Sequence, residues 1–400
     1  MNKVITSLLS LGVACSAALA ANGAISAVKV SDKLDGISAE SPLWAKAKYT
    51  TVTLYPQTAV HMNDKKANEA NAADKAKNAQ VAALYNGKTL AINVKWTDGT
   101  KDVQGAYSSD TYSDGFALQF AGATKKSGPL PYIGMGSDGR PVVVHLQKAT
   151  ASVYEPNGNK DVSTQINRNQ TNLFGKDLAD YDAKVASLAK TDYERSFVGE
   201  GFRSLTEIKD GSSASAAAMV YSSNGWSGTV SRPLKDAYVN STGTVPVAIA
   251  VWDGSKMGRN GLKNLSSWVA VNLEGMKPDA KIVGEIAEEA KGDAAKGKEA
   301  LAANGCAGCH QVTAADAPSF MAPSLQNVGG YSTVAYLRES ILKPSAVVVP
   351  GYNRNAHSNT PWYTIEKGKR VSTMTDYSFL DKNTVNDIVA YLKTLKAEVE

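Results

Sequence analysis

The pentapeptide Cys306-Ala307-Gly308-Cys309-His310 determines the fold of the C-terminal part of this 400-residue chain. Two thiols three positions apart can each add to one vinyl group of a porphyrin, and the histidine that follows is then held beneath the iron. A zinc site would need four ligands, and Cys15 is the only other cysteine. A redox dithiol is typical of a βαβ setting, which the surrounding sequence does not predict. The spacing therefore predicts one covalent haem c with His310 as an iron ligand.

Residues 292–400 around this motif resemble the class I cytochrome c family, which has an all-α fold. Pro323, in Ala322-Pro323-Ser324-Leu325, matches the family's proline whose carbonyl holds the proximal histidine. Met374, in Val371-Ser372-Thr373-Met374-Thr375, matches the distal thioether ligand, although the proline that usually follows is Thr375. Met321 is the rival, but its place beside Pro323 puts it on the proximal side. Iron held by both His310 and Met374 has no open position, so it carries electrons rather than substrate. Helices are expected at Ala294–Ala303, Val334–Leu342 and Asn383–Leu395.

Residues from about 49 to 273 are mostly strand-like. Leu90, Ile92, Val94 and Trp96 alternate with smaller or polar residues, and the Asn86-Gly87 turn before them predicts a hairpin with residues 80–85. Many short strands between Gly, Asn and Asp turns predict an all-β antiparallel sandwich or barrel. Residues 63–78 read as a loop or short helix, and the polar stretch 157–197 contains one helical piece at 178–188. Further strands are expected at Lys48–Leu54, Gly115–Phe120, Val142–Leu146, Ala216–Tyr221, Thr229–Arg232, Val245–Asp253 and Trp268–Leu273.

Several segments within residues 29–276 resemble the haem-binding gamma subunits of the ethylbenzene dehydrogenase type, which accompany molybdenum enzymes of the dimethyl sulfoxide reductase family. The segments are Val52–Gln57, Ser113–Phe120, Ile133–Gly136, Pro141–Ala149, Val251–Gly254 and Asn260–Trp268. The resemblance implies a β-sandwich that holds one non-covalent haem b between a methionine and a lysine, which are Met135 and Lys263 here. His145 replaces a family tryptophan and is an alternative ligand, with His61 as the next candidate. A lysine ligand must be the neutral amine, which an apolar pocket favours.

The first twenty residues have the pattern of an export signal. Lys3 precedes an uncharged apolar stretch that ends in Ala18-Leu19-Ala20, a small-x-small cleavage pattern. Cys15 offers lipoprotein anchoring as a minor alternative. No later stretch is apolar enough to span a bilayer. We therefore expect a periplasmic protein with a signal peptide at 1–20, a sandwich domain at 21–277, a linker at 278–291 and a cytochrome c domain at 292–400.

Composition limits the function classes. The chain is 43% hydrophobic and 20% charged, with a net charge of +5 and no Lys/Arg cluster, so nucleic acid is not an expected partner. The sequence contains no molybdopterin-binding pattern and no set of iron–sulfur cysteines. By resemblance, we expect a dihaem electron-transfer subunit or redox partner of a molybdenum oxidoreductase that has catalytic and iron–sulfur subunits. That enzyme would act on nitrate, another oxyanion or a small organic compound in anaerobic respiration. Two alternatives are a stand-alone haem enzyme with an open site in the large domain, and a binding or sensing sandwich fused to a monohaem cytochrome c.

Overall fold

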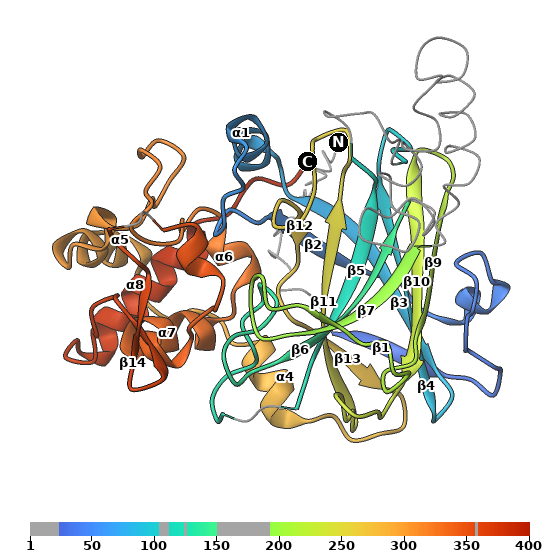
Figure 1. Cartoon of the computed structure of the whole chain (residues 1–400). Helices are drawn as coiled ribbons and strands as arrows, with labels where there is room; N and C mark the ends of the chain where they lie inside the picture. The colour runs from blue at the N-terminus through green and yellow to red at the C-terminus, as the bar shows by residue number, and fades with distance from the viewer. Residues whose placement is uncertain (1–23, 104–111, 124–125, 150–192, 357–358) are drawn as a thin grey trace, which may run out of the picture.

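The computed structural model describes residues 24–103, 112–123, 126–149, 193–356 and 359–400. The predicted export signal, Cys15 and the helical piece expected at 178–188 lie outside the described residues. The described part consists of a β-sandwich followed by a helical domain (Figure 1). The two-domain fold class predicted from the sequence is confirmed.

Within the described residues, thirteen strands form one sheet in the order β8-β7-β6-β5-β11-β12-β2-β3-β4-β10-β9, with β1 and β13 paired beside this path. Trp96 of β4 and Phe116 of β5 lie with ring centroids 5.7 Å apart although their strands are not neighbours in the sheet. The sheet therefore folds into two layers that face each other across an apolar core. The strands are β1 Ile25–Lys29, β2 Thr50–Pro56, β3 Lys77–Tyr85, β4 Thr89–Thr97, β5 Gly115–Ala121, β6 Val142–Lys148, β7 Tyr193–Gly199, β8 Thr206–Glu207, β9 Ala216–Tyr221, β10 Gly225–Pro233, β11 Thr244–Trp252, β12 Asn264–Leu265 and β13 Val269–Leu273.

Strands β5, β6 and β11 are covered on both faces, and this determines where a site can form. Phe116, Leu118 and Phe120 point into the core between the layers. The side chains that alternate with these along the strands point to the other face of the layer. Among them, Ala117 of β5 and Ala248 of β11 belong to a second apolar cluster, which also contains residues of the helical domain. Because side chains alternate along a strand, one layer serves the sandwich core and the domain interface at once.

The predicted strands are all present, most with shifted ends, and two features differ from expectation. β1 pairs in parallel with both β13 and β3, so the sandwich is not purely antiparallel. β7 (Tyr193–Gly199) overlaps the end of the polar stretch at 157–197 and was not predicted, because Glu194, Arg195 and Ser196 hide its strand pattern. Residues 65–73 form helix α1 (Lys65–Ala73), which Asp64 caps, so the short-helix reading of 63–78 applies.

The helical domain contains α5 (Ala294–Ala303), α6 (Val328–Tyr331), α7 (Val334–Leu342) and α8 (Lys382–Thr394), with a small hairpin of β14 (Tyr363–Glu366) and β15 (Lys369–Ser372). Helices α5 and α8 cross at close range: a Cβ at Gly297 would lie 1.8 Å from the carbonyl oxygen of Asp387. Asp381 caps α8 by accepting from the backbone N–H of Asn383 and of Thr384. In the described parts of the chain, we find no helix both long and apolar enough to cross a membrane.

The two domains pack directly on each other. Arg140 of the sandwich forms a bidentate ion pair with Glu339 of α7. Tyr132 stacks on Tyr336 of α7 with centroids 5.0 Å apart. The expected linker contains helix α4 (Ala280–Ile286), whose Glu285 side chain accepts from the N–H of Leu130 at 2.7 Å. The connection is therefore itself part of the interface.

Candidate cofactor sites

The large domain has a cavity of about 660 Å³ on the outer face of the β6-β5-β11 layer. Its lining includes Ala117 of β5 and Ala248 and Ala250 of β11. These small side chains leave room beside the sheet for a flat ligand, while Phe197 and Phe202 add apolar walls. A cavity of this size, mostly apolar with a few polar groups, has the character of a cofactor pocket.

Met135 enters the cavity from a strained turn. Its φ is +73°, which few residues other than glycine adopt. The turn is held by backbone hydrogen bonds from Gly136 N to Tyr132 O at 2.8 Å and from Gly201 N to Met135 O at 2.7 Å. Backbone strain of this kind costs about 1–3 kcal/mol and concentrates at functional sites. The backbone of Met135 is therefore fixed at the cavity wall, which its side chain lines.

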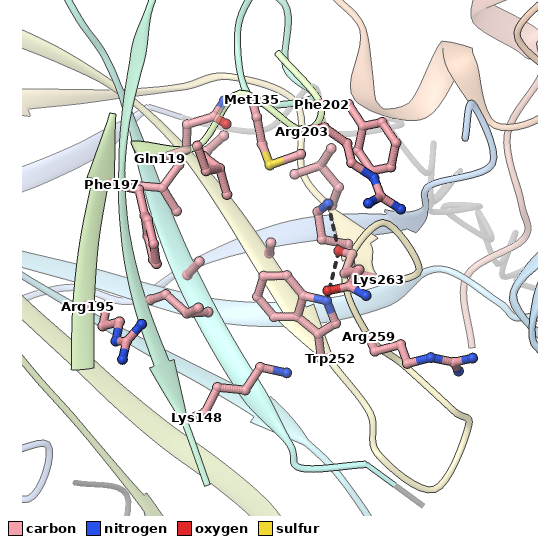
Figure 2. Close-up of a pocket in the computed structure, with 18 of the residues that line it drawn as sticks. Gln119, Met135, Lys148, Arg195, Phe197, Phe202, Arg203, Trp252, Arg259 and Lys263 are labelled. Atoms are coloured by element: carbon pink, nitrogen blue, oxygen red, sulfur yellow. Dashed lines mark hydrogen bonds between the residues drawn. The ribbon is translucent and has the colours of Figure 1, made fainter. Parts of the chain in front are cut away.

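Lys263 lines the same cavity, so the structure brings together the two ligands that the resemblance implies (Figure 2). Lys263 is 5% exposed, and its Nζ lies 3.4 Å from the carbonyl oxygen of Asn260. The same oxygen also accepts a hydrogen bond from Trp252 Nε1. Burial, with a smaller effect from the charge of Lys148, lowers the pKa of Lys263 to about 8. The neutral amine that iron requires is accordingly easier to form than on a surface lysine.

The polar part of the lining is cationic. It contains Lys148, Arg195, Arg203 and Arg259 besides Lys263, and none of the described lining residues is acidic. Arg259 also pairs with Asp64 at 2.5 Å. A haem carries two propionate carboxylates, which such guanidinium and ammonium groups bind well. The thioether, the buried amine, the apolar floor and the cationic lining together fit a haem b.

His145 does not reach this cavity. It lies on β6 between Val144 and Leu146, which line the cavity, so its side chain points to the opposite face and into the sandwich. Its Nδ1 lies 2.7 Å from Ser196 Oγ, and its ring packs against Phe120. Burial lowers its pKa to about 3. The alternative ligand role of His145 is therefore corrected: the pleat of the strand places it on the wrong side of the sheet.

His61, the other histidine considered, lies at the domain interface. Its carbonyl accepts from Asn355 of the helical domain, and its ring is 6.2 Å from that of Phe320. The described residues that line the large-domain cavity include its neighbour Met62 but not His61. The structure therefore gives His61 a packing position rather than a place among the ligands.

The helical domain has a second cavity, of about 510 Å³, around the Cys306–His310 motif. Both cysteines, His310 and Met374 line it. Gly305, with a φ of +71°, ends the turn after α5 and begins the short 3-10 turn Cys306–Gly308. This places both thiols on the edge of one cavity, as attachment to two vinyl groups requires.

His310 is oriented by Pro323, whose carbonyl oxygen lies 2.7 Å from His310 Nδ1. A backbone carbonyl only accepts, so Nδ1 carries the proton and Nε2 is left for iron. Met374 is half-buried on the cavity wall, whereas Met321, also on the wall, is 48% exposed. Cys306, Cys309, His310 and Met374 together fit a covalent haem c, and Met374 is better shielded from water than Met321.

One turn connects the two cavities, which sequence reasoning did not anticipate. Tyr132 lines the helical-domain cavity and Met135, three residues later, lines the large-domain cavity. Tyr132 packs on Tyr336 and on Tyr352, and burial raises the pKa of all three phenols, so they stay neutral. The sequence offered only scattered aromatic residues here, because the cluster joins positions more than 200 residues apart.

Comparison with known families identifies the family that each domain matches. A family model described as ethylbenzene dehydrogenase matches residues 41–264, more than half of the chain. A cytochrome c family model matches residues 294–396. No curated protein matches the chain.

Among solved structures, a family 9 carbohydrate-binding module from Caldicellulosiruptor kristjanssonii is similar in two complexes, both with a TM-score of 0.30. The glucose complex has 8% identity and covers 64% of this chain and 97% of the module; the cellotriose complex has 9% identity and covers 64% and 95%. Likeness at this level supports no statement about ligands. The two family matches show that the chain belongs to the ethylbenzene dehydrogenase family, carries a cytochrome c domain, and is a haem-containing electron-transfer protein.

Proposed function

We propose that this chain is a periplasmic dihaem electron-transfer subunit or redox partner of a molybdenum oxidoreductase of the dimethyl sulfoxide reductase family. One observation carries the proposal: Met135 and Lys263 line one cavity, and the turn that bears Met135 also lines the cavity of the Cys306–His310 motif. The partner enzyme, with catalytic and iron–sulfur subunits, would act on nitrate, another oxyanion or a small organic compound.

The chain's residues serve electron transfer rather than bond chemistry. When bound, each haem supplies a one-electron carrier whose potential the axial ligands set. Two protein ligands at each site leave no open coordination position, which disfavours the stand-alone enzyme. Lys263 releases its proton to bind, helped by burial, and Pro323 fixes the tautomer of His310. The buried Tyr132 packs on the half-buried Tyr336 and Tyr352, which places aromatic side chains at the wall of the haem c cavity three residues from Met135.

Two lysines of the cavity lining allow a matched test of the ligand set. Lys148 and Lys263 line the same cavity, and their Nζ atoms lie 5.1 Å and 5.6 Å from the ring centroid of Trp252. Lys263→Ala should release haem b or leave it high spin, while Lys148→Ala should keep it low spin. Met135→Ala should act like Lys263→Ala, and all three variants should keep a low-spin haem c. A full complement of low-spin haem b in Lys263→Ala would overturn the assignment.

The partner is tested by isolating the chain from its native cells. A tagged chain should bring with it a molybdopterin protein and an iron–sulfur protein, identified by mass spectrometry. That enzyme should exchange electrons with haem c in wild-type protein and much more slowly in Lys263→Ala. Isolation of the chain alone, with no exchange of electrons with any molybdenum enzyme from the same cells, would contradict the partner assignment.

A further inference from the structure

Four aspartates meet at one end of the sandwich, outside both cofactor cavities. Asp98 follows β4, Asp114 precedes β5, Asp253 follows β11, and Asp102 lies in the loop after β4. One carboxylate oxygen from each lies within 4.8 Å of the others. Oxygen ligands on opposite sides of a calcium ion are about 5 Å apart, since Ca–O distances are about 2.3–2.6 Å. The spacing therefore suits one cation surrounded by four carboxylates.

One carboxylate oxygen in this cluster has no partner. Asp98 is 5% exposed, and its Oδ1 accepts from the backbone N–H and the hydroxyl of Thr100. Its Oδ2 is buried and, among the described residues, has no hydrogen-bond donor. A buried acceptor left unsatisfied is costly and calls for a ligand. A cation among the four aspartates would satisfy it.

The charge in the cluster is also unbalanced. Lys77 pairs with Asp253 Oδ2 at 2.8 Å, and the ammonium groups of Lys148 and Lys256 interact electrostatically with Asp114 and Asp253. Even with these three ammonium groups counted, the four carboxylates keep a net negative charge when all are ionised. Asp114 accepts hydrogen bonds from three N–H donors, those of Gly254, Asp102 and the indole of Trp226, although burial raises the pKa of its carboxyl to about 7. Uncompensated buried charge is strongly unfavourable, and a divalent cation removes most of it.

We propose that Asp98, Asp102, Asp114 and Asp253 form a calcium site that fastens the ends of β4, β5 and β11 together. Calcium is favoured over magnesium because the ligands come from three separate segments, and calcium accepts the irregular oxygen geometry that magnesium rejects. The site adjoins the haem b cavity, because Ser113 and Trp252, next to Asp114 and Asp253, line that cavity. Calcium thereby stabilises one wall of the cavity.

Calorimetric titration of the whole purified protein tests this site without using electron transfer as a readout. Protein dialysed against a chelator, and shown by elemental analysis to be calcium-free, should bind one Ca²⁺ per chain and gain thermal stability. Mg²⁺ should bind at least tenfold more weakly. Asp98→Asn should weaken Ca²⁺ binding at least tenfold, and Asp32→Asn, which removes an exposed partner of Lys46, should not change it.

Asp102→Asn provides a second variant if Asp98→Asn does not fold, because Asp102 is less buried. Calcium that survives chelation and appears at one equivalent by elemental analysis also supports the site, provided that the aspartate variants lack it. Calcium-free wild-type protein that neither releases heat nor gains stability with Ca²⁺ would overturn the proposal. Unchanged affinity in both aspartate variants, or preference for Mg²⁺, would overturn it equally.

Discussion

At the scale of single residues, Met374 and Met321 both line the haem c cavity, and only their environments distinguish them. Met374 is half-buried beside the β14–β15 hairpin, whereas Met321 is 48% exposed next to Pro323. A thioether ligand stabilises ferrous iron. Met374→Ala should therefore lower the potential of haem c and open it to carbon monoxide, while Met321→Ala should do neither. Redox titration and ferrous spectra with carbon monoxide measure both effects.

The opposite pattern, with a carbon monoxide complex in Met321→Ala alone, would assign the distal ligand to Met321. The short, specific motif of covalent haem attachment indicated Cys306, Cys309 and His310, and the resemblance to class I cytochromes c then indicated Met374. The thioether and amine of the large domain have no such local motif. Met135 and Lys263 could be predicted only through resemblance, since a lone methionine or lysine usually has an ordinary structural role.

At the scale of elements, the pleat of β6 explains both what the sequence predicted and what it missed. A strand was predicted at Val142–Leu146, and β6 extends it to Lys148. Both of its faces carry apolar and polar side chains, so the pattern could not show which face is interior. The structure places Leu146 and Lys148 on the cavity side. Strict alternation then places His145 in the core, where it has no access to a cofactor.

The buried His145 makes stability depend on pH. Burial lowers its pKa to about 3, so below pH 6.5 the unfolded chain takes up a proton here that the folded chain does not. The free energy of unfolding should fall as pH falls from 6.5 towards 3, by about 2 kcal/mol at pH 5 from this group. Denaturant unfolding at pH 7 and pH 5 measures this difference. His145→Gln should lose it, and an identical pH dependence in wild type and variant would contradict the account.

At the scale of the whole molecule, the sequence predicted two domains but not their contact. The interface is built from residues distant in sequence, such as Tyr132 with Tyr336, and its ion pair joins Arg140 to Glu339. None of these has a local signature, because an apolar residue at a domain interface looks the same in sequence as one in a core. The spatial link between the two cofactor cavities therefore became visible only in three dimensions.

The Arg140–Glu339 pair should hold the domains in place. Arg140 has a side chain 3% exposed, so Glu339→Ala leaves a buried guanidinium unpaired, which costs about 3–5 kcal/mol. Calorimetry should then show the two domains unfolding in separate transitions. The control substitution is Glu288→Ala. It removes the partially exposed partner of Arg338, a residue of α7 next to Glu339, and should cost about 0–1 kcal/mol. Equal effects of the two substitutions would show that the buried pair does not fasten the domains.

The number and kind of haems in one chain test the central claim most directly. Pyridine haemochrome spectra of the fully loaded protein, before and after extraction with acidified acetone, distinguish covalent from non-covalent haem. The account predicts two haems per chain: one haem b that is extracted and one haem c that stays attached through Cys306 and Cys309. A fully loaded chain that contains only the covalent haem would contradict it.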